Sequence, residues 1–471
     1  MPCEGGFSTN KTKEQETTQQ TNLGEGSVGK LLLKLALPAI VAQMVNMLYN
    51  MVDRIYIGHI PEVGDLALTG LGLCFPIIMI ISAFSSLIGS GGAPRAAIFM
   101  GKGKPEEGEK ILGNCSATLV VIAITLTVLL EVFGEKILFL FGASENTITY
   151  ALPYMRIYVA GTIFVMVSLG LNMFITTQGF ANIAMKTVMI GAVCNIILDP
   201  IFIFLFDMGV QGAALATILS QGISAVWVMK FLTGSKTKLR IRKENLRMKP
   251  QIMLPVLALG VAPFIMSATE SILNIAFNSS LSKYGGDVAV GAMTILSSIM
   301  SLMFMPAQGL AQGAQPIISY NYGAGKMDRV RKAYHILITS CTTYTMTFWL
   351  MLNIFPRFFV GLFNSNSPEL METTVWALGI YMAGSGVFGI QSGVQQTFVA
   401  LGQAKLSLFI ACLRKIILLI PLIYILPVFM ENKIFAVFLA EPVADFISVT
   451  VASLLFFFNI SKILTKAEKS M

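Results

Sequence analysis

The chain has 471 residues, of which 55% are hydrophobic and 12% charged, and its mean hydropathy is +0.73. Soluble domains carry roughly 25% charged residues, so this composition excludes a soluble enzyme and indicates a protein with many membrane spans. The net charge of +8 does not indicate nucleic-acid binding, because the basic residues crowd alternate loops. The six cysteines are scattered and form no Cys-x-x-Cys pair, so neither a disulfide framework nor a zinc site is expected.

The first 29 residues are polar and lack the apolar stretch of a signal peptide, so we expect residues 1–29 to form a disordered cytoplasmic tail. The apolar runs that follow predict an all-α polytopic membrane protein with twelve transmembrane helices. We expect the spans at roughly 31–57, 66–91, 108–133, 150–177, 183–206, 212–232, 252–281, 288–315, 329–354, 371–396, 405–427 and 435–459.

Lysine and arginine predict the orientation of these spans. They concentrate around residues 102–110, 230–249 and 326–332 and in the carboxy-terminal tail, whereas the opposite loops carry mostly acids. Basic residues stay on the cytoplasmic side. We therefore expect a multi-pass protein of the cell membrane with both termini and the central loop in the cytoplasm.

The two halves of the chain resemble each other. The segment from Pro94 to Lys104 recurs from Pro316 to Lys326, and the offset 316 − 94 = 222 also relates Leu35-Ala-Leu37 to Leu257-Ala-Leu259. One register shared by two separate segments indicates duplication into two pseudo-symmetric six-helix lobes with the same orientation. We expect an N-lobe over 30–232, a cytoplasmic inter-lobe loop over 233–250, a C-lobe over 251–459 and a cytoplasmic tail over 460–471.

Asp199 is a lone carboxylate in the apolar fifth span. A charge at membrane depth is costly and usually faces a partner, a cavity or an ion. Asn195 lies one turn earlier on the same helix face. Pro200 has no N–H, so it is expected to bend the helix and free the carbonyl of Ile196. An acid, an amide oxygen and a loosened carbonyl together indicate a site for a small cation.

Three further polar residues lie within spans. Asp53 ends the first span and could join Asp199, although an interfacial pair with Arg54 is an alternative. Thr217, on the small-residue run of the sixth span, could add a hydroxyl oxygen or bond its own helix. Glu270 in the seventh span could attract a cationic substrate, carry a proton or accept a buried hydrogen bond. We assign no role to Arg414 and Lys415 in the eleventh span, where snorkelling toward the cytoplasm would suit them.

No Walker A run, metal-ligand cluster or nucleophile–base pair occurs in the sequence. These absences argue against an enzyme, an ATP-driven pump and any bound cofactor or metal other than Na⁺. An ion gradient is therefore the expected source of energy.

Twelve spans, the six-plus-six repeat and the motif Asn195-x-x-x-Asp199-Pro200 resemble the multidrug and toxic compound extrusion (MATE) family. Val52-Asp53, Tyr154-Met-Arg-Ile157 and the paired Pro-x₆-Gly-x-Gly loops are similar to its DinF-like, MepA-type branch. The resemblance implies a V-shaped pair of lobes with rocker-like alternating access. In the N-lobe it implies a cation site, with further polar positions around it. The implied cation ligands are Asp53, Asn195, Asp199 and Thr217, and the surrounding positions are Tyr49, Tyr154 and Asn172.

The other known branch of that family uses a C-lobe acid in the tenth span, which here has no Asp or Glu between Ala377 and Gln396. A complete C-lobe cation site is therefore not expected, and Glu270 remains a candidate for substrate binding or coupling. We expect a monomer in the lipid bilayer that exports amphipathic, cationic drugs in exchange for Na⁺ or H⁺. The alternative is a lipid-linked oligosaccharide flippase, which would need a strongly cationic cavity. The sequence leaves the choice between Na⁺ and H⁺ open.

Overall fold

The computed structural model describes residues 21–61, 63–363 and 367–469, and helices are the regular elements found there. The first half holds α2 (Val28–Gly58), α3 (Gly64–Gly101), α4 (Pro105–Leu140), α5 (Glu145–Ala160), α6 (Thr162–Thr177), α7 (Ala181–Pro200), the π-turn η2 (Ile201–Leu205), α8 (Gly209–Thr233) and the 3₁₀ turn η3 (Lys243–Asn245). The second half holds α9 (Pro250–Gly323), α10 (Met327–Ile354), α11 (Pro356–Gly361), α12 (Pro368–Tyr381), α13 (Phe388–Ala400), α14 (Ala404–Cys412), the π-turn η4 (Leu413–Leu419), α15 (Ile420–Phe429) and α16 (Lys433–Lys469).

The helices account for the expected spans. Eight helices in the described ranges are long and apolar enough to cross a membrane, or nine if α5 and α6, bent by 56° at Gly161, form one span. Helix α9 has 74 residues and is interrupted at Gly286, whose φ of 62° is non-helical, so it supplies two crossings. Its second leg, α10 and the broken pair α12–α13 bring the crossings to twelve. The all-α polytopic fold is thus confirmed.

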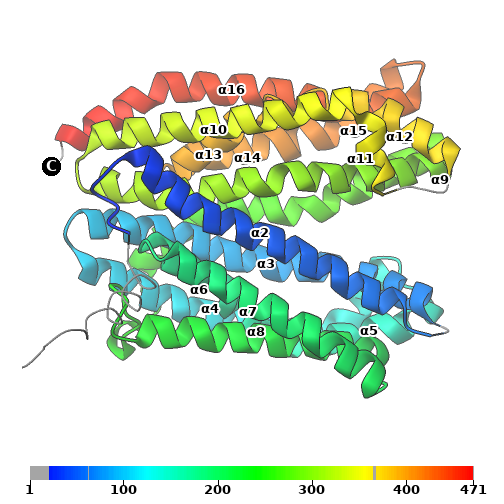
Figure 1. Cartoon of the computed structure of the whole chain (residues 1–471), viewed down its shortest axis with the longest axis horizontal. Helices are drawn as coiled ribbons and strands as arrows, with labels where there is room; N and C mark the ends of the chain where they lie inside the picture. Colours follow the sequence, from blue (N-terminus) through cyan, green and yellow to red (C-terminus); the bar gives the residue numbers. More distant parts are fainter. Residues whose placement is uncertain (1–20, 62, 364–366, 470–471) are drawn as a thin grey trace, which may run out of the picture.

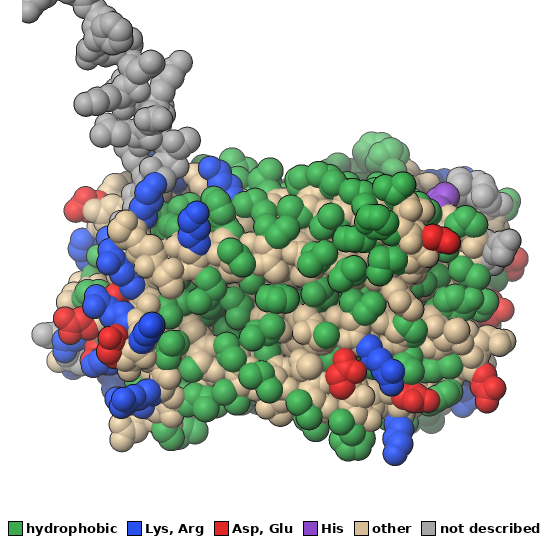
Figure 2. Space-filling view, turned by 90° about the horizontal axis from the view of Figure 1, so that it is seen from below, with side chains coloured by type: hydrophobic (Ala, Val, Ile, Leu, Met, Phe, Trp, Pro, Cys, Tyr) green, Lys and Arg blue, Asp and Glu red, His purple; other side chains and the backbone are tan. Residues whose placement is uncertain are grey.

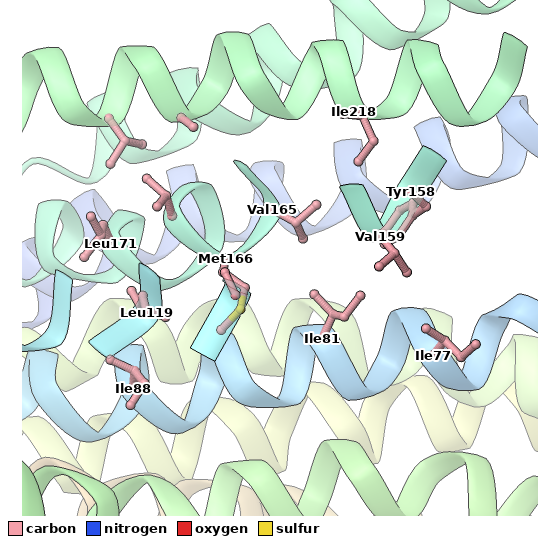
Figure 3. Close-up of a cluster of buried hydrophobic side chains, with 14 of the residues drawn as sticks. Ile77, Ile81, Ile88, Leu119, Tyr158, Val159, Val165, Met166, Leu171 and Ile218 are labelled. Carbon is pink, nitrogen blue, oxygen red and sulfur yellow. The ribbon is translucent and has the colours of Figure 1, made fainter. Parts of the chain in front are cut away.

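The helices form two lobes that lie as two layers in Figure 1. Each lobe has its own apolar core, because the helices turn large aliphatic and aromatic side chains toward one another. Figure 3 shows part of the N-lobe core, in which Ile81 and Ile88 of α3 lie near Leu119 of α4 and Met166 of α6. The outer faces are also apolar, and Figure 2 shows hydrophobic side chains over the middle of the molecule with Lys and Arg crowded at one end.

The lobes meet through glycines that repeat with the offset seen in the sequence. Gly101 lies against the backbone of Tyr320, and Gly323 lies against the backbone of Ile98. Both members of the pair are related by the same shift, because 323 − 101 = 222 and 320 − 98 = 222. A Cβ atom at either glycine would overlap backbone atoms of the other lobe. The duplication is therefore present in the contacts between lobes as well as in the sequence.

Further glycines continue this contact along α3 and α9. Gly91 lies against the backbone of Val256, and Gly260 lies against that of Leu87. In the second leg of α9, Gly313 and Gly309 allow α2 to approach in the same way, at Ala36 and Ile40. We call these contacts the glycine seam. They lie toward the ends of α2, α3 and α9 that are near both described termini.

The first helix of each lobe begins in the other lobe. Leu31, Leu35 and Ala36 at the start of α2 share a core with Ala314 and Leu337 of the C-lobe, while the rest of α2 packs on α7. Conversely, Met253 and Val256 at the start of α9 belong to the N-lobe core. The lobes are thus interlocked at the seam end.

Residues 21–26, which we call the strap, cross this end of the molecule. Thr21 N donates to Gly179 O of the N-lobe (3.4 Å). From the C-lobe, Asn321 Nδ2 donates to Leu23 O (2.9 Å) and Arg329 donates to the carbonyls of residues 25 and 26. Of the tail expected to be disordered, residues 1–20 lie outside the described residues. The expectation is wrong for residues 21–29, because these contacts order the strap and α2 begins at Val28.

The inter-lobe loop is fastened to the N-lobe. Gln178 Oε1 accepts hydrogen bonds from Leu239 N (2.8 Å) and from Thr237. Glu109 pairs with Arg242 at 2.7 Å, and Asn114 Oδ1 accepts from Lys249 N at 2.7 Å. This loop therefore follows the N-lobe, whereas the strap is held mainly by the C-lobe.

Candidate functional site

A buried polar cluster lies where α7 and α8 pack in the N-lobe. Asn195 Nδ2 donates to Asp199 Oδ1 (3.1 Å) and contacts Thr217 Oγ1 (3.4 Å). Asp199 is 0% exposed, and the other two are also buried. Asn195 and Asp199 meet because residues four apart share a helix face, and Gly212 to Ala216 let α8 come close with small side chains.

Asp53 joins this cluster from α2, which packs against α7. The carboxylate is buried and interacts electrostatically with that of Asp199. Among the described ion pairs none joins it to Arg54, whose guanidinium lies over the ring of Phe75 at 5.7 Å. The two charges still interact electrostatically, but the alternative of a direct Asp53–Arg54 ion pair is not found among the described ion pairs.

Three oxygens of the cluster have no hydrogen-bond partner within the described part of the chain. They are Asp53 Oδ1, Asn195 Oδ1 and Asp199 Oδ2. Buried polar atoms are nearly always paired, and leaving one unpaired costs about 1–3 kcal/mol. Carboxylate, amide and hydroxyl oxygens are the ligands that hard cations prefer, and a carboxylate can equally take up a proton. The donor set therefore fits a monovalent cation such as Na⁺, or H⁺.

Two of the three surrounding positions lie at the cluster and the third does not. Tyr49 of α2 and Tyr154 of α5 both interact electrostatically with Asp53, and Tyr154 stacks on Tyr158 with ring centroids 6.2 Å apart. Asn172 instead donates to Ala184 O (3.1 Å) and links α6 to α7. Ala184 is 195 − 184 = 11 residues before Asn195, or roughly 16 Å along the helix, so Asn172 lies away from the cluster.

The helix geometry changes at Pro200, next to the cluster. Helix α7 ends at Pro200 and the π-turn η2 follows directly. Asp207 and Gly209 then adopt positive φ angles of 52° and 54°, which start α8 in the opposite direction. Single π-turns within helices often mark functional sites. The acid Asp199 thus sits at the last regular turn of its helix, where the backbone can rearrange with the least loss of α-helical bonding.

Glu270 belongs to a different group of charges, in the C-lobe. It pairs with the Nζ of Lys415, which also donates to Met266 O (2.8 Å). The neighbouring Arg414 pairs with Glu441 and Asp445 of α16, each at 2.7 Å. We call these five residues the C-lobe network. Lys415 and Arg414 are buried, so they do not snorkel to the surface.

Glu441 and Asp445 were not predicted as site residues. A signal was present, because the two acids are four residues apart on one face of an apolar span. The partner arrangement was harder to foresee. Adjacent residues of an α-helix point about 100° apart, but Arg414 and Lys415 lie in the π-turn η4 and both pair with acids, Arg414 with two buried ones and Lys415 with the exposed Glu270.

Two interlocked six-helix lobes with a buried oxygen site define the class of this protein as a polytopic membrane transporter. The MatE family model matches residues 38–201 and again 263–425, once in each lobe. The chain therefore belongs to the MatE family.

Curated relatives of the chain are transporters of this family. The chain is 22% identical over 426 residues to Multidrug export protein MepA of Staphylococcus haemolyticus, covering 90% of this chain and 93% of that protein. It is 24% identical over 404 residues to MepA of Staphylococcus aureus (strain MSSA476), covering 85% and 87%. The resemblance to the MATE family and its MepA-type members is thus confirmed.

Solved structures share the fold along nearly the whole chain. A MATE crystal structure in the bent conformation matches with a TM-score of 0.88 at 22% identity, covering 94% of this chain and 98% of that one. The outward-facing conformation of a multidrug resistance MATE transporter matches with a TM-score of 0.87 at 23% identity, covering 95% and 99%. A transporter of Pyrococcus furiosus, described as having a binding pocket of reversed polarity, matches with a TM-score of 0.88 at 22% identity, covering 95% and 99%.

Proposed function

We propose that this protein exports amphipathic, cationic drugs across the cell membrane in exchange for Na⁺ or H⁺. Relatives named multidrug export proteins cover most of the chain and support the class of substrate. The observation that carries the exchange is the set of three unpartnered oxygens on Asp53, Asn195 and Asp199. In this proposal the coupling ion fills that set, and the protein acts as a monomeric transporter without a cofactor and not as an enzyme.

The differing residues at the two ends of the lobe contact support alternating access. The glycine seam closes the end near the termini, which the positive-inside rule assigns to the cytoplasm. Toward the other end, α9 carries a polar face, in which Glu270 and Asn278 are exposed and Asn274 is half-buried. Such side chains suit a water-filled cleft rather than lipid. In this proposal the structure corresponds to the outward-facing state, and transport requires the seam to part.

Coupling requires that ion and drug favour different conformations, since a ligand shifts an equilibrium only by its differential affinity. Binding of an ion at Asp199 would first change the backbone conformation at Pro200 and in the π-turn η2, which join α7 to α8. Rearrangement there would change the wall that the N-lobe presents to the cleft. A drug bound in the other conformation would be released when ion binding shifts the equilibrium.

The flippase alternative is less well supported. A pyrophosphate group needs unpaired positive charge, whereas Arg414 and Lys415 are each paired with acids. The acids of the N-lobe cluster would repel it further.

The test is drug efflux from proteoliposomes that are driven separately by a sodium gradient and by a pH gradient. We expect ethidium movement with one of the two gradients and none without a gradient. Transport of a lipid pyrophosphate in the same vesicles would favour the flippase. Failure of both gradients to drive any organic cation would overturn the proposal.

A further inference from the structure

The C-lobe network is one positive charge short. It contains three acids (Glu270, Glu441, Asp445) and two bases (Arg414, Lys415). Arg414 is shared between the two buried acids of α16, and Asp445 Oδ2 has no hydrogen-bond partner among the described residues. The missing positive charge therefore leaves a buried acid incompletely paired. A further cation can reach the network only at its one exposed acid.

That exposed acid is Glu270. The side chain of Glu270 is 55% exposed, whereas that of Lys415 is 8% exposed and those of the two α16 acids are 4% exposed or less. The buried Lys415 thus contacts Glu270 from the interior of the C-lobe and leaves the exposed side of the carboxylate accessible. Glu270 also continues the polar face of α9 with Asn274 and Asn278, so the open side faces the cleft proposed above.

We propose that the ammonium of Lys415 occupies, in the absence of substrate, the position at Glu270 where the charge of a cationic substrate binds. A lipophilic monocation displaces this ammonium when it binds. Glu441 is the next acid for Lys415, because it pairs at 2.7 Å with Arg414, the adjacent residue of η4, and it interacts electrostatically with both Lys415 and Glu270. With the ammonium moved to Glu441, Arg414 retains Asp445 and the incoming cation takes Glu270. Three cations then balance three acids, so the exchange proceeds without leaving a buried charge unpaired.

The apolar groups beside the network indicate the shape of the cation. Arg414 lies over the ring of Phe388 at 4.4 Å, and Phe388 packs against Phe304 with centroids 4.7 Å apart. Met266 adds a flexible thioether one turn before Glu270. The two rings pack against each other beside Arg414 in the buried part of the network, whereas Met266 lies beside the Glu270–Lys415 pair and can adapt its shape to a bulky lipophilic cation. This inference deepens the proposed function, on which it rests for the direction of transport.

The experiment measures binding of tetraphenylphosphonium to the full-length protein in detergent by calorimetry. In Lys415→Met the competing ammonium is gone, so we expect the cation to bind about tenfold tighter. Glu270→Gln removes the anchor and is expected to weaken binding about tenfold. In the Glu270→Gln/Lys415→Met double variant the gain from Lys415→Met should vanish. The control is Lys283→Met, which removes the same charge from a lysine that lies over Tyr284, and it should leave binding unchanged.

Unchanged or weaker binding in Lys415→Met would overturn the inference and make Lys415 a structural cation. If that variant does not fold, Lys415→Gln retains a donor without the charge and must show the same gain. If the protein shows gradient-driven efflux but Lys415→Met leaves its affinity for tetraphenylphosphonium unchanged, this inference alone is refuted. A protein that shows the predicted affinities but exports nothing with either gradient would refute the proposed function instead.

Discussion

The two lobes share a fold but carry opposite electrostatic designs. In the N-lobe, Asp53 and Asp199 are both buried and interact electrostatically, and neither is in any of the described ion pairs. In the C-lobe, Arg414 and Lys415 supply most of the positive charge that three acids require. A site that must load and release a free ion has to leave oxygens available, whereas a site with its own cations is nearly neutral when empty. Under the two proposals above, duplication produced one lobe that exchanges an ion and one that holds an organic cation.

The comparison predicts its largest effect at Asp199. Asp199→Asn removes the negative charge but preserves the size of the side chain and the contact with Asn195. We expect gradient-driven ethidium efflux from proteoliposomes to fall to the level of empty vesicles, while the melting temperature changes little. Asp207→Asn is the matched control, because this exposed acid lies eight residues later, and asparagine tolerates its positive φ. Efflux at the wild-type rate by Asp199→Asn would rule out the N-lobe exchange site.

In the C-lobe, we expect removal of a network charge to lower the stability of the protein. Arg414→Met leaves Glu441 and Asp445 buried without a cation, which is expected to cost about 3–5 kcal/mol. A fluorescence-detected melting curve in detergent should show a large decrease. Combining Arg414→Met with Glu441→Gln and Asp445→Asn should restore most of the loss. An unchanged melting temperature in the single variant would mean that the acids are not ionised.

A smaller effect is expected at Thr217, which contributes a hydroxyl oxygen but no charge to the N-lobe cluster. Thr217→Val preserves the shape and removes that oxygen. We expect the concentration of the driving ion needed for half-maximal efflux to rise about threefold to tenfold, with the maximal rate retained. Thr127→Val is a control, because that hydroxyl bonds a backbone carbonyl elsewhere in the lobe. Equal ion dependence in all three proteins would remove Thr217 from the site.

The smallest difference is expected between the two halves of the seam. Gly101→Ala and Gly323→Ala each place a Cβ against the other lobe's backbone, and overpacking of this kind costs about 1–3 kcal/mol. Because the two contacts are related by the repeat, we expect the two variants to shift the melting temperature equally. A large inequality would show that the seam is not symmetric in energy.

Much of the fold could be predicted because the governing signals are local. Apolar runs of membrane length and the constant shift of 222 residues predicted an all-α membrane protein built from two halves, and the family model matches each half once. The pairing of Asn195 with Asp199 follows from helical spacing alone. The break inside α9 was predicted as well, because the expected spans 252–281 and 288–315 leave the turn that the structure has at Gly286.

The remaining site residues depended on tertiary packing. Asp53 reaches the cluster only because α2 packs on α7, and Asn172 misses it because its helix faces α7 three turns away from Asn195. The C-lobe network escaped prediction for a different reason. The acids Glu441 and Asp445 were not considered beside Arg414, since a π-turn that directs two adjacent bases inward has no clear sequence signature.

The strap has a mechanical consequence for the amino-terminal end of the chain. Five hydrogen bonds join residues 23–26 to Asn321, Lys326 and Arg329, but one long bond joins Thr21 to Gly179. Separation of the lobes at this end would break the single bond and keep the five. The strap, and the chain that precedes it, would then move with the C-lobe. A fluorophore attached before Thr21 would then report the motion of the C-lobe relative to the N-lobe without disturbing the ion site or the drug site.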